Sequence, residues 1–344
     1  MKIFKFAILF SLMWLILLAC QESSSSNQPQ PRISPMASVA QTIGDSTTVT
    51  ITYSRPGVKG RTIWGELVPL DKVWRTGANV ATTISFNKDL VVEGQKLPAG
   101  TYALFTIPTK TKWTVIFNKE ADQWGAFNYK QSEDALRIEV TPKAADHVEW
   151  MDFSFQDLTA TSAKVVLRWE KLAVPFNIET TVSAEKPRLS PKATVWQVLG
   201  DSTKVAFTFS RPGVKEREIW GALVPYDKVW RTGANENTTL SVSGDVTIEG
   251  QKLSAGAYGI HTIPGENEWT VIFSNNAGLW GSRDYKQEED ALRIQVKPQQ
   301  TGDLQERMLF SFPILTPDAS KVVRSAQVVL RWEKLAVPFT VSVQ

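Results

Sequence analysis

Residues 53–79 read YSRPGVKGRTIWGELVPLDKVWRTGAN, and residues 209–235 repeat them as FSRPGVKEREIWGALVPYDKVWRTGAN, with 22 of 27 positions identical. The same offset of 156 residues relates Ser34-Pro35 to Ser190-Pro191 and Tyr129-Lys130-Gln131 to Tyr285-Lys286-Gln287. Each copy is about 150 residues long, which is a common size for a domain with its own core. The chain is therefore expected to contain two similar domains in tandem.

Each copy has the pattern of antiparallel β-strands. Val49, Ile51 and Tyr53 alternate with polar residues, and residues 113–117 form a run of β-branched and aromatic side chains. Turn sequences such as Pro98-Ala99-Gly100 separate these runs, and no stretch shows a long helical period. With about seven to nine short strands per copy, the sequence predicts an all-β chain of two tandem antiparallel β-sandwich, jelly-roll-like domains.

The point where the repeat restarts predicts the domain boundaries. Residues 31–35 correspond to residues 187–191, so the first β-sandwich repeat is placed at 31–183 and the second at 187–344. A join this short is expected to keep the two sandwiches in contact. The second copy is longer by one residue before Glu306 and by six between Thr316 and Ala326, and we expect these insertions to form surface loops.

The N-terminus has the features of an export signal. Lys2 and Lys5 precede an apolar run over residues 6–18, which is too short for a transmembrane helix. Residues 1–20 resemble a bacterial lipoprotein signal peptide, in which cleavage precedes a cysteine that is then lipidated. The resemblance implies a diacylglyceryl anchor at Cys20, and hence a membrane partner for the chain.

The residues after this signal extend the same interpretation. Cys20 is the single cysteine, so a disulfide within the chain is excluded. Gln21 at the next position implies sorting to the outer membrane of the cell envelope. Residues 21–30 are polar and serine-rich, and they predict a flexible tether.

Six motifs in the first copy together carry a resemblance to a known family. They are Tyr53-Ser54-Arg55-Pro56, Lys59-Gly60-Arg61, Ile63-Trp64-Gly65, Val73-Trp74-Arg75-Thr76-Gly77-Ala78-Asn79, Pro98-Ala99-Gly100-Thr101-Tyr102 and Trp113-Thr114-Val115-Ile116-Phe117. The chain is similar to domain-of-unknown-function family 2911, exported proteins common in Bacteroidetes-type envelopes. The resemblance covers nearly all of both copies and implies a fold and a location, but no activity.

Charge and composition exclude several classes of function. The formal net charge is +3, and without Lys2 and Lys5 the chain has 38 − 2 = 36 basic and 35 acidic residues, a net charge of +1. This balance gives no electrostatic basis for binding nucleic acid. Glycine-rich phosphate loops and metal-binding motifs are not found in the sequence, so no cofactor and no metal are predicted.

Three arginines in each copy, together with nearby tryptophans and an asparagine, are candidates for a ligand site. Guanidinium groups suit carboxylates, phosphates or sugar hydroxyls, and indole rings offer a stacking face. The candidate residues are Arg55, Arg61, Trp64, Trp74, Arg75 and Asn79 in the first copy and Arg211, Arg217, Trp220, Trp230, Arg231 and Asn235 in the second. The alternative is that the arginines tie loops to carboxylates or carbonyls while the tryptophans fill the core, which is the commoner arrangement in β-sandwiches.

Arg75 and Arg231 are the strongest of these candidates. They lie beside Gly77 and Gly233, where a backbone without side chains would let a ligand approach closely. The second copy has Glu216 in place of Gly60, which is expected to alter the loop and, with Glu218, to neutralise an anion site. A single active copy is therefore one of the possibilities.

Catalysis common to both copies has little support. His147 has no counterpart in the second copy, and His261 corresponds to Phe105, so no duplicated imidazole is present for base catalysis or metal binding. Paired carboxylates remain as a route to glycoside hydrolysis. The pairs retained in both copies are Asp71 and Asp227, Glu93 and Glu249, Asp134 and Asp290, and Glu170 and Glu333.

These observations favour a non-catalytic envelope protein that binds a saccharide, another small polar or anionic ligand, or a protein partner. An envelope glycan hydrolase that uses paired carboxylates is the enzymatic alternative. A structural spacer or complex subunit is the third. The binding hypothesis predicts that Arg55, Arg75 and Trp74 converge on one accessible pocket.

Overall fold

The computed structural model describes residues 32–44, 46–181 and 188–344. The predicted signal peptide, its lipidation site Cys20, the tether and the join at 183–186 lie outside the described residues. No helix in the described part is long and apolar enough to span a membrane.

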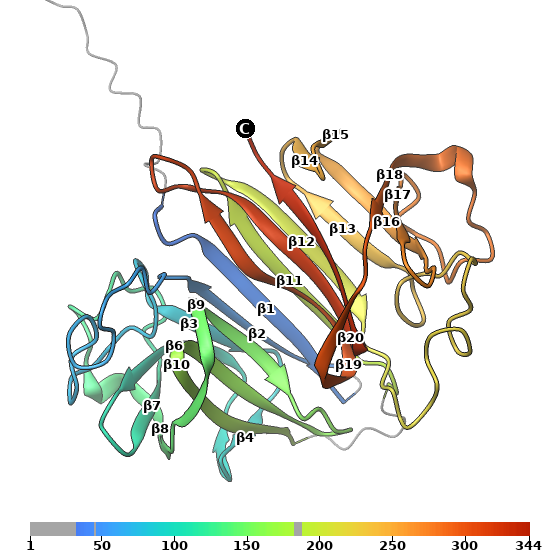
Figure 1. The fold of residues 1–344 in the computed structure, drawn as a ribbon. Helices are drawn as coiled ribbons and strands as arrows, with labels where there is room; N and C mark the ends of the chain where they lie inside the picture. Colours follow the sequence, from blue (N-terminus) through green and yellow to red (C-terminus); the bar gives the residue numbers. More distant parts are fainter. Residues whose placement is uncertain (1–31, 45, 182–187) are drawn as a thin grey trace, which may run out of the picture. The chain divides into compact units, whose positions relative to one another are not determined.

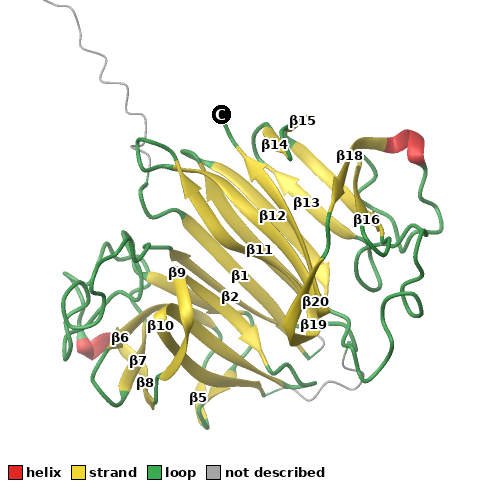
Figure 2. Cartoon of the chain, in the orientation of Figure 1, coloured by secondary structure: helices red, strands yellow, loops and turns green. Residues whose placement is uncertain are grey.

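The first copy consists of strands, turns and one short 3₁₀ helix (Figures 1 and 2). Its elements are β1 (Met36–Ile43), β2 (Thr47–Ser54), β3 (Thr82–Phe86), β4 (Leu90–Val92), β5 (Gln95–Leu97), β6 (Gly100–Ile107), β7 (Trp113–Asn118), η1 (Gln131–Glu133), β8 (Asp134–Val140), β9 (Lys143–Gln156) and β10 (Ser162–Thr180).

The second copy repeats these elements in the same order. They are β11 (Lys192–Leu199), β12 (Thr203–Ser210), β13 (Thr238–Val242), β14 (Val246–Ile248), β15 (Gln251–Leu253), β16 (Gly256–Ile263), β17 (Trp269–Ser274), η2 (Gln287–Glu289), β18 (Asp290–Val296), β19 (Gln299–Pro317) and β20 (Val323–Ser342). The all-β prediction and the tandem arrangement are therefore confirmed.

Each copy is a sandwich of a six-stranded and a four-stranded antiparallel sheet. The alternation of Val49, Ile51 and Tyr53 in β2 buries these side chains between the sheets, as the sequence predicts. The four-stranded sheets have the orders β5-β4-β10-β9 and β15-β14-β20-β19. Each sandwich encloses a core of its own.

The two six-stranded sheets are joined into one sheet of twelve strands, a feature that the sequence did not predict. The order is β18-β17-β16-β13-β12-β11-β1-β2-β3-β6-β7-β8, and β1 and β11 form the junction, which we call the seam (Figure 1). Val39 pairs with Val195, its own counterpart in the repeat, and Ala37 and Gln41 pair with Gln197 and Ala193. The seam therefore has the pairing of a two-fold symmetric dimer interface within one chain.

The second layer also meets at the seam. Strands β9 and β19 are the end strands of the two four-stranded sheets, and they contact each other. Their outer backbone groups therefore face one another without a strand between them. The outward-facing carbonyls of β9 and β19 are therefore available as acceptors for the buried arginines described below.

The six-residue insertion of the second copy is not simply the surface loop that the sequence suggested. It lengthens the β19–β20 hairpin, and Val322, Val323 and Ala326 are buried there. Leu315 at the base of this extension accepts a hydrogen bond from Trp150 Nε1 of the first copy at 3.1 Å. A residue just before the insertion thus contacts the first copy.

Candidate functional site

Arg55 lies buried at the seam, with only 2 % of its surface exposed. Its Nε donates to the carbonyl of Met151 in β9 at 2.9 Å, and its Nη1 donates to the carbonyl of Phe312 in β19 at 3.0 Å. Nη1 also donates to Gln197 Oε1 in β11 at 2.9 Å. One guanidinium group therefore joins β9 to two strands of the other copy.

Arg211 makes the same contacts in the opposite direction. Its Nε donates to the carbonyl of Met308 in β19 at 3.1 Å, and its Nη1 donates to the carbonyl of Phe155 in β9 at 3.2 Å and to Gln41 Oε1 at 2.7 Å. The outer carbonyls of β9 and β19 are thus satisfied by arginine donors where a further strand would otherwise be needed. Both arginines hold the fold together and do not form part of an exposed loop pocket.

Arg61 and Arg217 bind carbonyls of their own loops. Arg61 donates through Nε to Val58 O at 3.1 Å and through Nη2 to Gly57 O at 2.5 Å, and Arg217 repeats both bonds. Glu216, which replaces Gly60, has a φ of 58°, against 68° for the glycine. The expected change of loop conformation therefore does not occur.

The four candidate tryptophans are parts of two packed aromatic clusters. In the first copy, Trp64 makes edge contacts with Trp74, Trp113 and Trp169, and Trp74 stacks on Trp169 with ring centroids 5.8 Å apart. In the second copy, Trp220 and Trp230 pack in the same way against Trp269 and Trp332. This repeated geometry is that of core packing at one end of each sandwich.

Arg75 and Arg231 differ from the other arginines because they have no ion pair or side-chain hydrogen bond among the described residues. The Nε atom of each is buried without a partner, and burial lowers the pKa of Arg75 below its ordinary value. Arg231 Nη1 lies against Gly281, since a Cβ added to this glycine would be only 2.9 Å from Nη1.

The neighbours of these arginines are engaged by the protein itself. A Cβ on Gly77 would meet Ser54 O and Thr82 Oγ1 at 3.1 Å, so the space beside this glycine is filled by the chain and does not admit a ligand. Asn79 donates through Nδ2 to Ser34 O at 3.2 Å. Asn235, with its amide oriented to satisfy both of its groups, accepts from Arg188 Nε and Nη2 at 3.2 Å each.

The predicted convergence of Arg55, Arg75 and Trp74 on one pocket is not what the structure shows. Arg55 and Arg211 line a cavity of about 80 Å³ at the seam, which includes neither Arg75 nor Trp74. The physical reason is that Arg55 extends into the seam, whereas Trp74 packs into the core of its own sandwich.

The retained carboxylates serve local structure. Asp71, Glu93 and Glu170 adopt positive φ angles, as do their counterparts in the second copy. Asp134 accepts hydrogen bonds from Tyr129 and Asn118 and pairs with Arg137. Neither the seam cavity nor the groove described below is lined by any of the predicted pairs. Among the described residues, no group of three or more His, Cys, Asp or Glu side chains could hold a metal ion.

His261 is fully buried, and neither ring nitrogen has a hydrogen-bond partner among the described residues. Burial lowers the pKa of His261 to about 4, so the imidazole is neutral at physiological pH. Its ring centroid lies 5.0 Å from that of Tyr285, as Phe105 lies 5.2 Å from Tyr129 in the first copy. The histidine thus occupies an aromatic packing position.

The second copy contains a groove of about 220 Å³ that the sequence did not predict. Its walls are formed by Thr208 and Ser210 in β12, by Thr239 in β13 and by the loop that precedes β13. Residues 277–280 form its rim. The lining residues used in the argument below are Lys192, Glu236, Asn237, Thr239, Leu279 and Trp280. Trp280 is 67 % exposed, although its backbone is held by a bridge to Glu236.

The charges within this groove are ordered. Glu236 forms an ion pair with Arg188 and lies 3.4 Å from Ser210 Oγ. Burial alone would raise the pKa of Glu236, but hydrogen bonds from its own backbone N–H and from Arg188 outweigh burial and lower it. The groove therefore presents a carboxylate, an ammonium, hydroxyls and an amide beside one exposed indole.

A family model described as "Protein of unknown function (DUF2911)" matches residues 34–178 and again residues 190–341. The chain belongs to this family. Comparison with curated proteins and with solved structures gave no match. The two DUF2911 copies are therefore the most useful comparison for each other.

The two copies differ in the residues that line the groove, whereas the arginine and tryptophan contacts described above are the same in both. Three groove positions are apolar in the first DUF2911 copy, where they are Met36, Val80 and Ala81, and polar in the second, where they are Lys192, Glu236 and Asn237. Two rim positions change in the opposite direction, from Asp122 and Gln123 to Gly278 and Leu279. The exposed tryptophan is present in both copies, as Trp124 and Trp280. The three replacements lie together in space, and aligning the copies position by position would have revealed them.

We expect Arg55→Ala to destabilise the DUF2911 pair strongly, because it leaves two buried carbonyls and Gln197 Oε1 without a donor. The free energy of unfolding should fall by about 3–5 kcal/mol. The measurement is urea unfolding followed by fluorescence. Arg61→Ala is the matched control, with an expected loss of about 1 kcal/mol or less, because Arg61 binds only its own loop. Equal losses in the two variants would contradict the role assigned to Arg55.

We expect His261→Phe to stabilise the protein. At pH 7 the gain should be about 1–3 kcal/mol, because two unsatisfied buried nitrogens are removed. The folded pKa of about 4 lies below the unfolded value, so the parent loses stability as the pH falls from 6.5 towards 4. At pH 5 the advantage of the variant should grow by about 2 kcal/mol.

The check for His261→Phe is urea unfolding of parent and variant at both pH values. Phe105→His is the control, because it introduces the same defect into the first copy and should lower stability. A lower stability of His261→Phe at both pH values would show that the imidazole makes a favourable contact.

Proposed function

We propose that the protein is a lipid-anchored binding protein of the cell envelope, and that its ligand is a saccharide or a similar hydroxyl-rich molecule held in the groove of the second copy. The anchor is Cys20, and the outer membrane is the proposed location. The observation that carries the proposal is the replacement of Met36, Val80 and Ala81 by Lys192, Glu236 and Asn237 around one groove.

The aromatic rim supports a ligand with both apolar and polar faces. Trp280 exposes two-thirds of its surface while a backbone bridge to Glu236 holds its main chain at the rim, so its indole is available to a ligand. Aromatic rings of this kind combine apolar area with a polar edge. The apolar C–H face of a sugar ring fits such a platform, and the hydroxyls of the sugar then point to the polar walls.

The walls offer donors and acceptors in the mixture that hydroxyl groups need. Lys192 donates, the Glu236 carboxylate accepts, and the Thr239 hydroxyl can do both. The Asn237 amide nitrogen is already bonded to the carbonyls of Ala277 and Leu279, and Thr208 and Ser210 to Thr194 and Glu236. A volume of about 220 Å³ is below the roughly 300–1,000 Å³ typical of drug-sized ligands. We therefore propose that the groove holds one sugar-sized unit of a ligand that extends into solvent.

The test is a titration, by calorimetry, of the full-length chain in a non-ionic detergent with cell-wall glycans, muropeptides and simple oligosaccharides. Trp280→Ala should weaken binding by about 30-fold, the effect of losing a central anchor worth about 2 kcal/mol. Trp124→Ala is the matched control, because it removes the equivalent tryptophan from the copy that has Met36, Val80 and Ala81 in place of Lys192, Glu236 and Asn237, and it should leave binding unchanged.

A second variant tests the polar walls. Glu236→Val combined with Asn237→Ala gives two of the groove positions the residues of the first copy and removes the carboxylate and the amide, so the variant should lose the ligand. Retained affinity in this variant, or an equal loss on Trp124→Ala, would contradict the proposed site. If no glycan binds, the proposal fails in favour of a protein partner or a scaffold role.

A further inference from the structure

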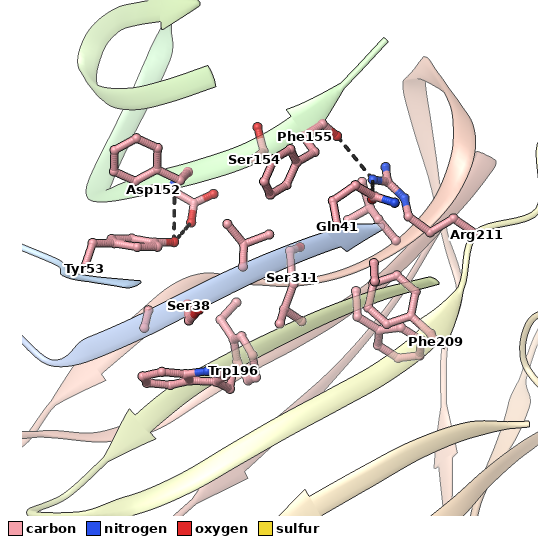
Figure 3. Close-up of a pocket in the computed structure, with 18 of the residues that line it drawn as sticks. Ser38, Gln41, Tyr53, Asp152, Ser154, Phe155, Trp196, Phe209, Arg211 and Ser311 are labelled. Carbon is pink, nitrogen blue, oxygen red and sulfur yellow. Dashed lines mark hydrogen bonds between the residues drawn. The ribbon is translucent and has the colours of Figure 1, made fainter. Parts of the chain in front are cut away.

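The seam cavity has two ends that are related by the repeat but differ in chemistry. It measures about 80 Å³ and is lined by both copies. Figure 3 shows Tyr53 and Asp152 at one end and Phe209 and Arg211 towards the other. These ends correspond position by position, since Phe209 is the counterpart of Tyr53 and Leu309 that of Asp152.

The first-copy end supplies its own anion. Tyr53 Oη donates to Asp152 Oδ1 at 2.7 Å, and Arg55 Nη2 lies 3.9 Å from the same oxygen. The phenol oxygen also accepts a hydrogen bond from the backbone N–H of Phe153 at 3.2 Å. Carboxylate, phenol, guanidinium and backbone N–H therefore form one connected set.

The second-copy end has the donors of this set without the acceptors. Arg211 is buried, and it has no ion pair among the described residues because Leu309 stands where the first copy has Asp152. Its Nε and Nη1 are bonded to protein, and its Nη2 has no hydrogen-bond partner in the part of the chain that the structure describes. Burial lowers the pKa of Arg211 to about 10, as expected for a guanidinium without a counter-charge.

A backbone donor lies beside this arginine. Both the N–H and the carbonyl of Met308 point away from β20, since they bond to Pro212 and to Arg211. Backbone groups two residues along a strand point the same way, so the N–H of Phe310 also faces the seam. Phe209 has no hydroxyl to accept it, whereas Tyr53 accepts the equivalent N–H of Phe153.

We propose that the second-copy end of the seam cavity binds a small monocarboxylate. Its carboxylate accepts from Arg211 Nη2 and from the N–H of Phe310, in the place that Asp152 and Tyr53 fill in the first copy. Its short apolar chain lies against Phe209, Phe310 and Val195. A cavity of this size has room for about five to eight water-sized positions, which suits propionate or butyrate.

The experiment is a calorimetric titration of the full-length chain in a non-ionic detergent with propionate and butyrate. Butyramide, which has the shape of butyrate without its charge, is the ligand control. One binding site per chain is expected for the acids and none for the amide. Binding of butyramide with the affinity of butyrate, or no binding of either acid, would overturn the proposal.

Exchange of equivalent residues between the copies sharpens the test. Leu309→Asp places a carboxylate where the first copy has Asp152, so it should weaken butyrate binding at least tenfold while keeping or raising the melting temperature. Asp152→Leu frees Arg55 at the other end, and because the cavity has room for only one such molecule, one site per chain should remain. Unchanged binding by a folded Leu309→Asp variant would overturn the proposal, whatever the outcome of the glycan titrations at the groove.

Discussion

The antiparallel pairing of β1 with β11 is the constraint on which the rest of the structure depends. Without it, each copy would expose the edge of its larger sheet, and the carbonyls of Phe155 in β9 and Phe312 in β19 would lose their arginine donors. The two-fold pairing of Val39 with Val195 places Arg55 and Arg211 where each reaches both end strands. Strand pairing joins the two copies in the twelve-stranded sheet. In the second layer, two buried guanidinium groups join β9 to β19 by hydrogen bonds to their carbonyls.

The duplication separates residues that hold the fold from residues that are free to diverge. The seam arginines, the loop arginines and the tryptophan clusters keep the same contacts in both copies. The groove and the seam cavity do not, since the polarity of their lining residues differs between the copies. Function is therefore proposed where the copies differ, because folding does not require these positions to be the same.

The sequence predicted the repeat and the all-β sandwich because strand alternation and turn residues are local signals. The seam left no such signal, since β1 and β11 alternate like any other strand and the partners of Arg55 lie 142 and 257 residues away. The groove was missed because Lys192, Glu236 and Trp280 are far apart in sequence. The tryptophans were recognised as possible core residues, but only their ring contacts decide between packing and binding.

Hydrogen exchange of the backbone amides tests the seam most directly. An end strand leaves every second amide open to water, whereas a strand paired on both sides protects all of them. We predict that the amides of residues 37–41 and 193–197, where β1 and β11 pair, exchange as slowly as those of β2 and β12. Fast exchange at alternate residues of β1 and β11, with β2 and β12 still protected, would contradict the joined sheet.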